Sequence, residues 1–276
     1  MYHWTDYIKN CLFVLMIVLV SCNRDNDNVI EDGIYVPLQI GDVSSDGIAF
    51  KGVSTRLETA LSTGDIGVFR LESTEYTETR SNVKYTYSGS VWDVASGTDP
   101  IYLTQNEANI CAYYPYSSDD DYTDGNITLT SQVYSEGADL CYQTNVNANS
   151  GTKKVSFTMG HCYAKLTLTF THIASYTGYC FVKDISIEND GILTSNTLDI
   201  TSGSYGTGTK GNVTVPDIGC ISSGTSAVVT VLMVPVSTLS GDITLSFNVD
   251  GQKVTKLHNI TSLEAGSTHD IKVDIQ

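Results

Sequence analysis

Apolar and polar residues alternate along most of this chain in short segments. The longest such ladder covers residues 155–173, where one face carries Ala164, Leu166, Leu168 and Phe170. A period of two places successive side chains on opposite faces of a strand, so that one face is buried. No long stretch has the apolar repeat of about 3.6 residues that is typical of an amphipathic helix. The pattern therefore predicts an all-β protein.

Strand-like segments recur at short intervals between turn signals, as a β-sandwich requires. Asp250-Gly251 is a hairpin signal because both residue types tolerate a positive φ. Residues 41–47 are expected to form a turn and residues 145–154 a polar loop. The expected strands cover residues 34–40, 48–51, 64–69, 83–87, 91–92, 101–103, 109–115, 127–130, 139–142, 155–170, 179–182, 185–187, 197–200, 212–215, 227–236, 243–249, 253–257 and 270–275.

A continuous apolar run at residues 12–20 follows a short polar head that contains Lys9. A transmembrane helix needs roughly 20 apolar residues, so this run is too short to span a bilayer but has the length of a secretory signal. The sequence Leu19-Val20-Ser21-Cys22 resembles a bacterial lipobox, in which the peptide is cleaved before a cysteine that is then lipidated. We expect residues 1–21 to be a lipoprotein signal peptide and Cys22 to be the lipidation site. An ordinary secretory signal is the alternative.

The rest of the chain divides into three expected parts. Residues 22–32 are polar and acidic, which predicts a flexible tether. The long apolar ladder and the polar loop before it place a domain boundary near residue 158. We therefore expect two consecutive β-sandwich domains, at residues 33–158 and 159–276.

Charge restricts the range of partners. The 276 residues include 31 Asp and Glu but 15 Lys and Arg, which gives a formal net charge of −16. A polyanion of this kind is repelled by nucleic acids and by acidic lipid head groups. The composition therefore argues against a nucleic-acid partner.

The cysteines do not form a metal-binding or redox pattern. Once Cys11 in the signal and Cys22 are set aside, an odd number remains, and none lies in a C-x-x-C spacing. They are interpreted mostly as buried thiols that form no disulfide, although one or two disulfides stay open for an exported protein. The cysteines concerned are Cys111, Cys141, Cys162, Cys180 and Cys220.

Two further features were weighed as candidate sites. His161 and Cys162 are adjacent, but neighbouring residues of a strand point to opposite faces, which disfavours a nucleophile–base pair or shared metal ligation. The acidic loop at residues 117–125 has Tyr122 where a calcium loop needs an oxygen ligand, and no Glu follows at its far end. We therefore expect no metal site, no cofactor and no catalytic residue, and thus no enzyme.

Several short segments occur in a recognisable order after the lipobox cysteine. They are Thr55-Arg56, residues 64–69, residues 87–92, residues 112–115, residues 139–142, residues 157–168, residues 232–235 and residues 264–273. In this order they resemble the fimbrillin family, which comprises the type V pilins and related surface lipoproteins of Bacteroides-like bacteria. The resemblance covers essentially the whole chain after the signal.

The resemblance implies two tandem transthyretin-like β-sandwich domains in a fimbrial subunit that supports adhesion. It also implies export to the cell surface as an outer-membrane lipoprotein and cleavage after Arg56 by an extracellular arginine-specific protease. Leu57 departs from the small residue that the family often has after this arginine. Cleavage would remove the preceding strands and open a groove, which a strand from another fimbrial subunit would fill by donor-strand exchange.

The last strand is the candidate donor, because Ile271, Val273 and Ile275 lie on one of its faces. The same strand can instead complete its own domain. For the whole protein, the alternative is a monomeric surface lipoprotein that binds glycan or a host ligand, using Tyr113, Tyr114 and Tyr116.

Overall fold

The computed structural model describes residues 35–46 and 59–276, and residues 35–276 form one compact unit. The expected signal peptide, Cys22, the tether, Arg56 and Leu57 lie outside the described residues. Within the described part, helix is limited to α2 (Asp120–Thr123) and the 3-10 turn η1 (Glu136–Ala138), and strands dominate. No helix in that part is long and apolar enough to span a bilayer. The prediction of an all-β protein is confirmed.

The strands in the first half of the chain are β1 (Val36–Pro37), β2 (Gln39–Ser45), β3 (Thr59–Ala60), β4 (Asp65–Arg70), β5 (Arg80–Tyr87), β6 (Trp92–Val94), β7 (Tyr102–Leu103), β8 (Ala108–Tyr114), β9 (Asn126–Thr130), β10 (Gln132–Val133), β11 (Cys141–Ala148) and β12 (Lys154–His161). Those in the second half are β13 (Ala164–His172), β14 (Phe181–Glu188), β15 (Leu193–Asp199), β16 (Ser204–Tyr205), β17 (Thr209–Lys210), β18 (Val213–Val215), β19 (Gly219–Cys220), β20 (Ser226–Met233), β21 (Ile243–Val249), β22 (Gln252–His258) and β23 (Thr268–Ile275).

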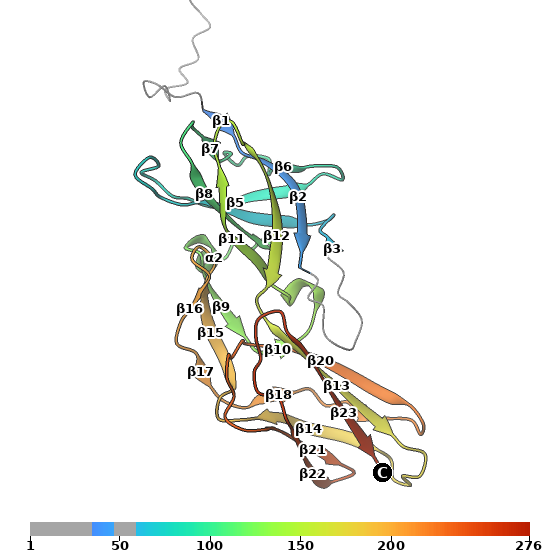
Figure 1. Cartoon of the computed structure of the whole chain (residues 1–276). Coiled ribbons are helices and arrows are strands. Elements are labelled where there is room, and N and C mark those ends of the chain that lie inside the picture. The colour runs from blue at the N-terminus through green and yellow to red at the C-terminus, as the bar shows by residue number, and fades with distance from the viewer. Residues whose placement is uncertain (1–34, 47–58) are drawn as a thin grey trace, which may run out of the picture. The chain divides into compact units, whose positions relative to one another are not determined.

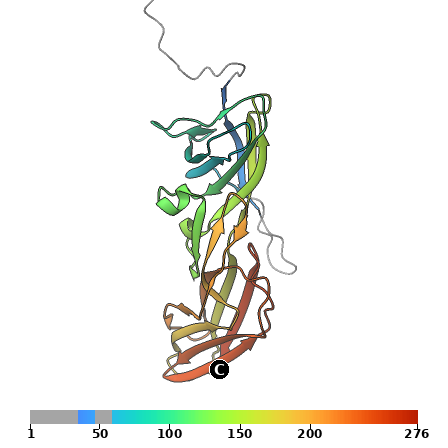
Figure 2. The same cartoon turned by 90° about the vertical axis from the view of Figure 1, so that its left-hand side faces the viewer.

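Most strands of the first half belong to one eight-stranded sheet with the order β12-β11-β8-β4-β5-β6-β2-β3. Strand β2 also pairs in parallel with β12, the first strand in this order, so the series of paired strands from β12 to β2 closes on itself. Figures 1 and 2 show the blue strand β2 running alongside the yellow-green strand β12. The inward side chains form a cluster that we call the N-terminal core, which includes Leu38, Ile40, Val43, Ile66, Val83, Trp92, Ile110, Val155, Phe157 and Met159.

The second half builds two sheets around another cluster, the C-terminal core. One sheet has the order β10-β20-β13-β23, and the other the order β18-β14-β21-β22 with β19 beside β14. Strand β13 alternates strictly between buried and half-buried positions, as its period of two predicts. Both sheets contribute to the core, whose members include Leu166, Leu168, Phe170, Ile185, Ile187, Leu245, Phe247, Ile271 and Val273.

A third core joins residues from both halves of the chain. Strand β9 pairs with β15, and β10 pairs with β20, so backbone ladders cross between the halves. Strand β12 itself continues without a break past residue 158 to His161. The division into two domains near this position stays a prediction. The third core contains Phe69, Cys111, Tyr113, Ile127, Leu129, Leu140, Cys162, Tyr163, Leu198, Ile200, Leu232 and Val234.

Some expected boundaries are wrong, and each error has a tertiary cause. Residues 41–45 continue β2 instead of turning, because they pair with β12 and bury Val43. Strand β11 continues to Ala148 through the expected polar loop, with a register irregularity that begins after Gln143 and a positive φ at Asn145. The hairpin at Asp250-Gly251 is confirmed, since both residues have a positive φ and β21 pairs with β22 around them.

Candidate functional site

Strands β1 and β2 form the described part of the chain that precedes Arg56. Strand β2 pairs in parallel with β12 through five register pairs, whereas a single pair, Ile40 with Trp92, joins it to β6. Ile40 and Val43 in β2, and Leu38 just before it, are 2–4% exposed and belong to the N-terminal core. The segment before Arg56 therefore adds a strand to the eight-stranded sheet and side chains to the N-terminal core. The other residues of this sheet and core mostly follow Arg56 in the chain.

A pocket of about 600 Å³ lies between β2 and β6, which share a single register pair. Residues 37–42 line it on one side and residues 90–94, including β6, on the other. Asp42, Asp93 and Lys154 add charged groups to a lining that is otherwise largely apolar. The boundary between β2 and β6 is thus only partly closed by backbone pairing.

The candidate donor strand β23 is an edge strand of the sheet β10-β20-β13-β23. It pairs in parallel with β13 through eight register pairs, from Lys165 with Thr268 to His172 with Ile275. Ile271, Val273 and Ile275 are 1%, 2% and 6% exposed and face the C-terminal core. The predicted alternation is therefore present, and the buried face packs in the strand's own half of the chain.

The tyrosines considered for glycan binding are not a common exposed surface. Tyr113 is completely buried, and its hydroxyl lies within hydrogen-bond distance of two acceptors, the Asn82 side-chain oxygen at 2.7 Å and the Ser117 carbonyl at 3.0 Å. Tyr114 and Tyr116 are half-buried. Stacking on a sugar ring requires an accessible aromatic face, which Tyr113 lacks.

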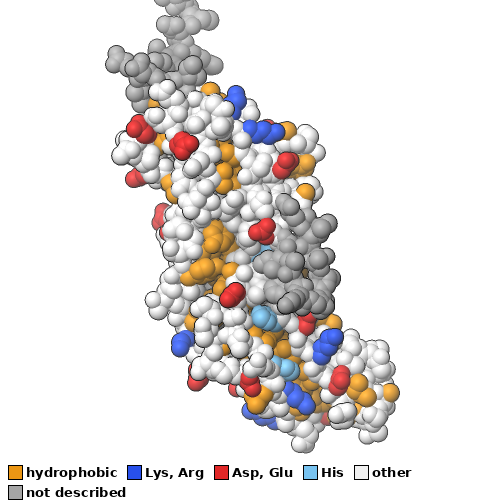
Figure 3. Space-filling model, viewed as in Figure 1, with side chains coloured by type: hydrophobic (Ala, Val, Ile, Leu, Met, Phe, Trp, Pro, Cys, Tyr) orange, Lys and Arg blue, Asp and Glu red, His pale blue; other side chains and the backbone are white. Residues whose placement is uncertain are grey.

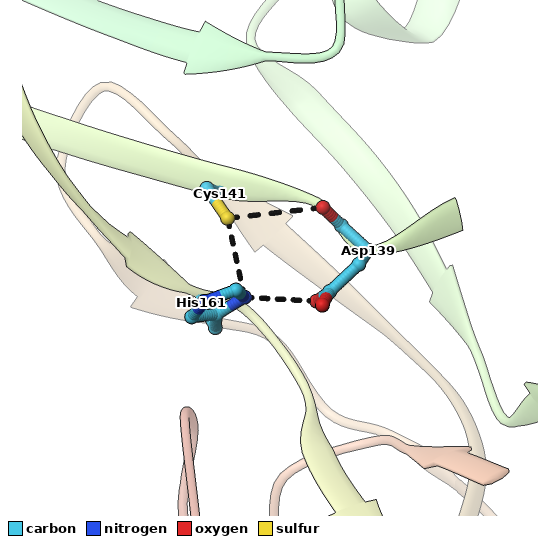
Figure 4. Close-up of side chains that lie close together, drawn as sticks. All are labelled: Asp139, Cys141 and His161. Atoms are coloured by element: carbon cyan, nitrogen blue, oxygen red, sulfur yellow. Dashed lines mark hydrogen bonds and ion pairs between the residues drawn. The ribbon is translucent and has the colours of Figure 1, made fainter. Parts of the chain in front are cut away.

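A cluster of three ionisable side chains, Asp139, Cys141 and His161, was not expected from the sequence. The Nδ1 atom of His161 lies 3.0 Å from Oδ1 of Asp139 and 3.2 Å from Sγ of Cys141 (Figure 4). The Cys141 sulfur also lies 3.7 Å from the Asp139 carbonyl oxygen. The Asp139 and His161 side chains are 9% exposed, and Cys141 is 3% exposed. We call this group the Asp–Cys–His cluster.

Strand register brings the cluster together. Cys141 and His161 are directly opposite one another on β11 and β12, although 20 residues separate them in sequence. The sequence analysis considered only the neighbour Cys162 as a partner of His161 and disfavoured that pair, and Cys162 indeed belongs to the third core. The available signal was an Asp-x-Cys segment that leads into one strand and a His in the next, but the register of the two strands could not be read from either strand alone.

The cluster does not have the geometry of a nucleophilic relay. In a thiol or serine hydrolase, the nucleophile and the carboxylate contact opposite nitrogens of the imidazole ring. Here the thiol and the carboxylate both face Nδ1 of His161. Three different ligand types converge instead, with all three ligand atoms within 4.8 Å of one another.

The five described cysteines are present as thiols. Cys111, Cys141, Cys162 and Cys180 are buried, as expected, whereas Cys220 is exposed. Burial raises the pKa of Cys111 to about 11, which keeps this thiol protonated and unreactive at neutral pH.

On the face shown in Figure 3, acidic side chains are scattered among neutral ones and do not gather into one acidic patch. The exposed large apolar side chains among the described residues include Tyr179, Val228 and Leu257.

Comparison with known proteins identifies the family. The fimbrillin-like family matches residues 55–276. The chain belongs to the fimbrillin-like family. The match begins beside Arg56, so β1 and β2 of this fimbrillin-like protein precede the matched region. Membership places the chain among fimbrial proteins of the cell surface. No curated protein matches the sequence.

Solved structures share the fold of this fimbrillin-like chain. A proposed cell adhesion protein from Bacteroides ovatus is 17% identical with a TM-score of 0.60, covering 87% of this chain and 92% of its own. One from Bacteroides uniformis is 20% identical with a TM-score of 0.58, covering 87% and 93%. One from Bacteroides fragilis is 14% identical with a TM-score of 0.52, also covering 87% and 93%.

Proposed function

We propose that this protein is a structural or accessory subunit of a cell-surface fimbria and acts in adhesion, not catalysis. It is exported as an outer-membrane lipoprotein through Cys22, cleaved after Arg56 by an extracellular arginine-specific protease, and assembled with other fimbrial subunits by donor-strand exchange. The observation that carries this proposal is the position of β1 and β2, which precede Arg56 yet pair with strands that follow it.

Loss of these strands would create an acceptor groove. Removing the segment that contains β1 and β2 uncovers the sites of Leu38, Ile40 and Val43, and burial of each such side chain contributes roughly 1.5–3 kcal/mol. It also leaves the edge of β12 without its parallel partner. An incomplete sheet beside an apolar groove favours the addition of another strand. The single pair between β2 and β6 supports release from that side.

The candidate donor, β23, resembles β2 in its setting. Strand β2 pairs in parallel with β12, and β23 pairs in parallel with β13, the next strand in the chain. Alternating apolar side chains also point inward at both places. They are Leu38, just before β2, and Ile40 in β2, and Ile271, Val273 and Ile275 in β23. A strand of this type can therefore replace β2 in a neighbouring subunit, at the expense of leaving its own core.

The test is an Arg56→Ala variant in cells that assemble the fimbria. We expect it to remain at full length and to form no SDS-resistant oligomers, whereas N-terminal sequencing of the unaltered protein should begin at Leu57. Lys51→Ala is the matched control, because an arginine-specific protease does not require that lysine. Normal polymers from Arg56→Ala would show that cleavage after this arginine does not trigger assembly. A cleaved product that stays monomeric and binds saccharide would favour the glycan-binding alternative.

A further inference from the structure

The Asp–Cys–His cluster has no role in the assembly function proposed above. Its three side chains present a carboxylate oxygen, a sulfur and an imidazole nitrogen toward one point between β11 and β12 (Figure 4). We propose that Asp139, Cys141 and His161 bind one divalent transition-metal ion, with zinc as the preferred ion.

The donor set selects this class of metal. Thiolate and imidazole are characteristic ligands of zinc, and a carboxylate commonly completes such a set. Calcium and magnesium bind oxygen ligands almost exclusively, so a site with Cys141 and His161 disfavours both. Three protein ligands leave a fourth tetrahedral position for water or another donor.

The two ligand distances that involve His161 are close to those that a bound ion imposes. Around a tetrahedral zinc, nitrogen and oxygen ligands lie roughly 3.4 Å apart and nitrogen and sulfur ligands roughly 3.6 Å apart, as follows from the usual bond lengths. The corresponding distances here are 3.0 Å and 3.2 Å. Each pair must therefore separate by roughly 0.4 Å to admit the ion, which small side-chain rotations accomplish.

The framework that holds the ligands is rigid. Cys141 and His161 are register partners in adjacent strands, so their Cβ atoms start from a fixed short separation. Asp139 lies between the turn η1 and β11, two residues before Cys141, and the Cys141 sulfur lies 3.7 Å from its carbonyl oxygen. A metal at this point would link β11 to β12 just before the chain passes into β13.

A divalent ion also balances the charge of the cluster. Cys141 binds as a thiolate and releases its proton to solvent, while His161 binds as the neutral imidazole. The two negative charges of Asp139 and Cys141 then match the two positive charges of the metal. Buried ionisable groups are costly unless they are paired or coordinate a metal, and these side chains are at most 9% exposed.

The experiment uses the chain from Asn23 to Gln276, which contains the compact unit 35–276 and lacks Cys11 and Cys22. Cys220 is replaced by Ser so that the exposed thiol does not bind metal. The reduced protein is titrated with zinc by calorimetry, and with Co²⁺ by absorbance. We expect one high-affinity ion per chain and a thiolate-to-cobalt charge-transfer band.

Single substitutions Asp139→Asn, Cys141→Ser and His161→Gln are then compared in this background. We expect at least about 100-fold weaker zinc binding for each, because changing even outer-shell partners of a metal costs 10–100-fold. Cys141→Ser should also abolish the charge-transfer band. His269→Gln is the control and should bind as tightly as the parent, and circular dichroism monitors folding throughout.

Failure to bind zinc would overturn the proposal, as would equal affinity in the parent and all three folded variants, which would assign the ion to surface carboxylates. A cobalt complex without a charge-transfer band would exclude Cys141 as a ligand. If one variant does not fold, the remaining two still decide the result.

Discussion

Gly67 has no side chain, and the ring of Tyr113 occupies the space where a Cβ atom would lie. Tyr113 is completely buried, and its hydroxyl is held by Asn82 and Ser117. A shift of the ring away from an added Cβ would therefore disturb these hydrogen bonds. At the scale of single residues, this contact between β4 and β8 depends on the absence of one methyl group.

We predict that Gly67→Ala destabilises the protein by about 1–3 kcal/mol, the usual cost of overpacking a core. Gly160→Ala is the matched control, because no atom lies within 4 Å of its added Cβ. Urea unfolding of both variants without metal measures the difference. Equal stability of the two variants would contradict this account of Gly67.

Arg70 is a buried cation with a defined set of contacts. Its Nη1 donates to the Tyr102 carbonyl at 2.7 Å and its Nη2 to the Glu78 carbonyl at 3.0 Å, while the guanidinium stacks 4.5 Å from the centre of the Tyr76 ring. Desolvation by burial lowers the pKa of Arg70 from its ordinary value. This arginine is therefore held inside the fold, where a protease does not reach it.

Arg70→Lys should cost about 2 kcal/mol, because an ammonium group cannot reproduce the two-armed guanidinium contacts. Arg80→Lys is the control, since Arg80 is more exposed and donates to the Asp99 carbonyl at 2.9 Å. Its change should stay within about 0.5 kcal/mol. Thermal and urea unfolding measure the stability of both variants. An Arg70→Lys protein as stable as the parent would show that the two guanidinium hydrogen bonds are not needed for stability.

At the scale of secondary-structure elements, β23 combines a strong ladder with the proposed role of a donor. A strand that pairs through eight register pairs and buries three apolar side chains must separate from β13 before it can enter a neighbour. Whether it separates is testable by covalent locking. Thr169 and Lys272 are register partners of β13 and β23 and suit a disulfide across the pair.

We predict that a Thr169→Cys, Lys272→Cys disulfide, made in the Cys220→Ser background, blocks polymerisation and that a reductant restores it. The matched control is Thr169→Cys with Val228→Cys, which locks β13 to β20, a strand that stays in place. SDS-resistant ladders are the measurement. Polymers from the oxidised β13–β23 variant would assign β23 to its own half and exclude it as the donor.

The same strand carries a group that responds to pH. Partial burial of His269 disfavours its charged form and lowers its pKa below the ordinary value of about 6.5. The unfolded chain thus binds a proton near pH 6.5 that the folded chain does not. The stability linked to His269 is complete above this pH and is lost as the pH falls toward the lower folded-state value. His258 in β22 shifts in the same direction, because burial lowers its pKa too.

The free energy of unfolding should therefore decrease when the pH is lowered from about 7.5 to about 5.5. His269→Gln should reduce this decrease, because glutamine does not titrate, while the contribution of His258 remains. Urea unfolding at several pH values measures both effects. An identical pH dependence in the parent and in His269→Gln would show that His269 does not contribute.

At the scale of the whole molecule, the proposed function requires attachment to the outer membrane. The described residues contain no helix that could span a bilayer, and the net charge of −16 disfavours electrostatic binding to acidic lipids. A cysteine that carries more than one acyl chain provides stable anchoring, whereas a single chain binds only marginally.

Cys22→Ala should therefore abolish acyl labelling and release the protein from the membrane fraction. Cys220→Ala is the control, because Cys220 is the exposed cysteine of the folded region, and its loss should leave labelling intact. Metabolic labelling with a fatty-acid analogue distinguishes the two variants. Undiminished labelling of Cys22→Ala would exclude the lipobox interpretation.

The sequence alone determined the features that depend on neighbouring residues. The period of two in β13 and β23 predicted strands and their buried faces, because side-chain direction alternates along any extended chain. Asp250-Gly251 predicted a hairpin, because local φ preference selects that turn. The order of short motifs indicated the family that residues 55–276 match.

Only the tertiary structure decided which strands meet. Residues 41–45, expected to form a turn, belong to strand β2. They are extended because they pair in parallel with the distant strand β12 and because Val43 is buried there. The register of β11 against β12 placed Cys141, which is 20 residues away in sequence, beside His161. Register depends on the packing of whole faces and on irregularities such as the one after Gln143. No local pattern in either strand contains that information.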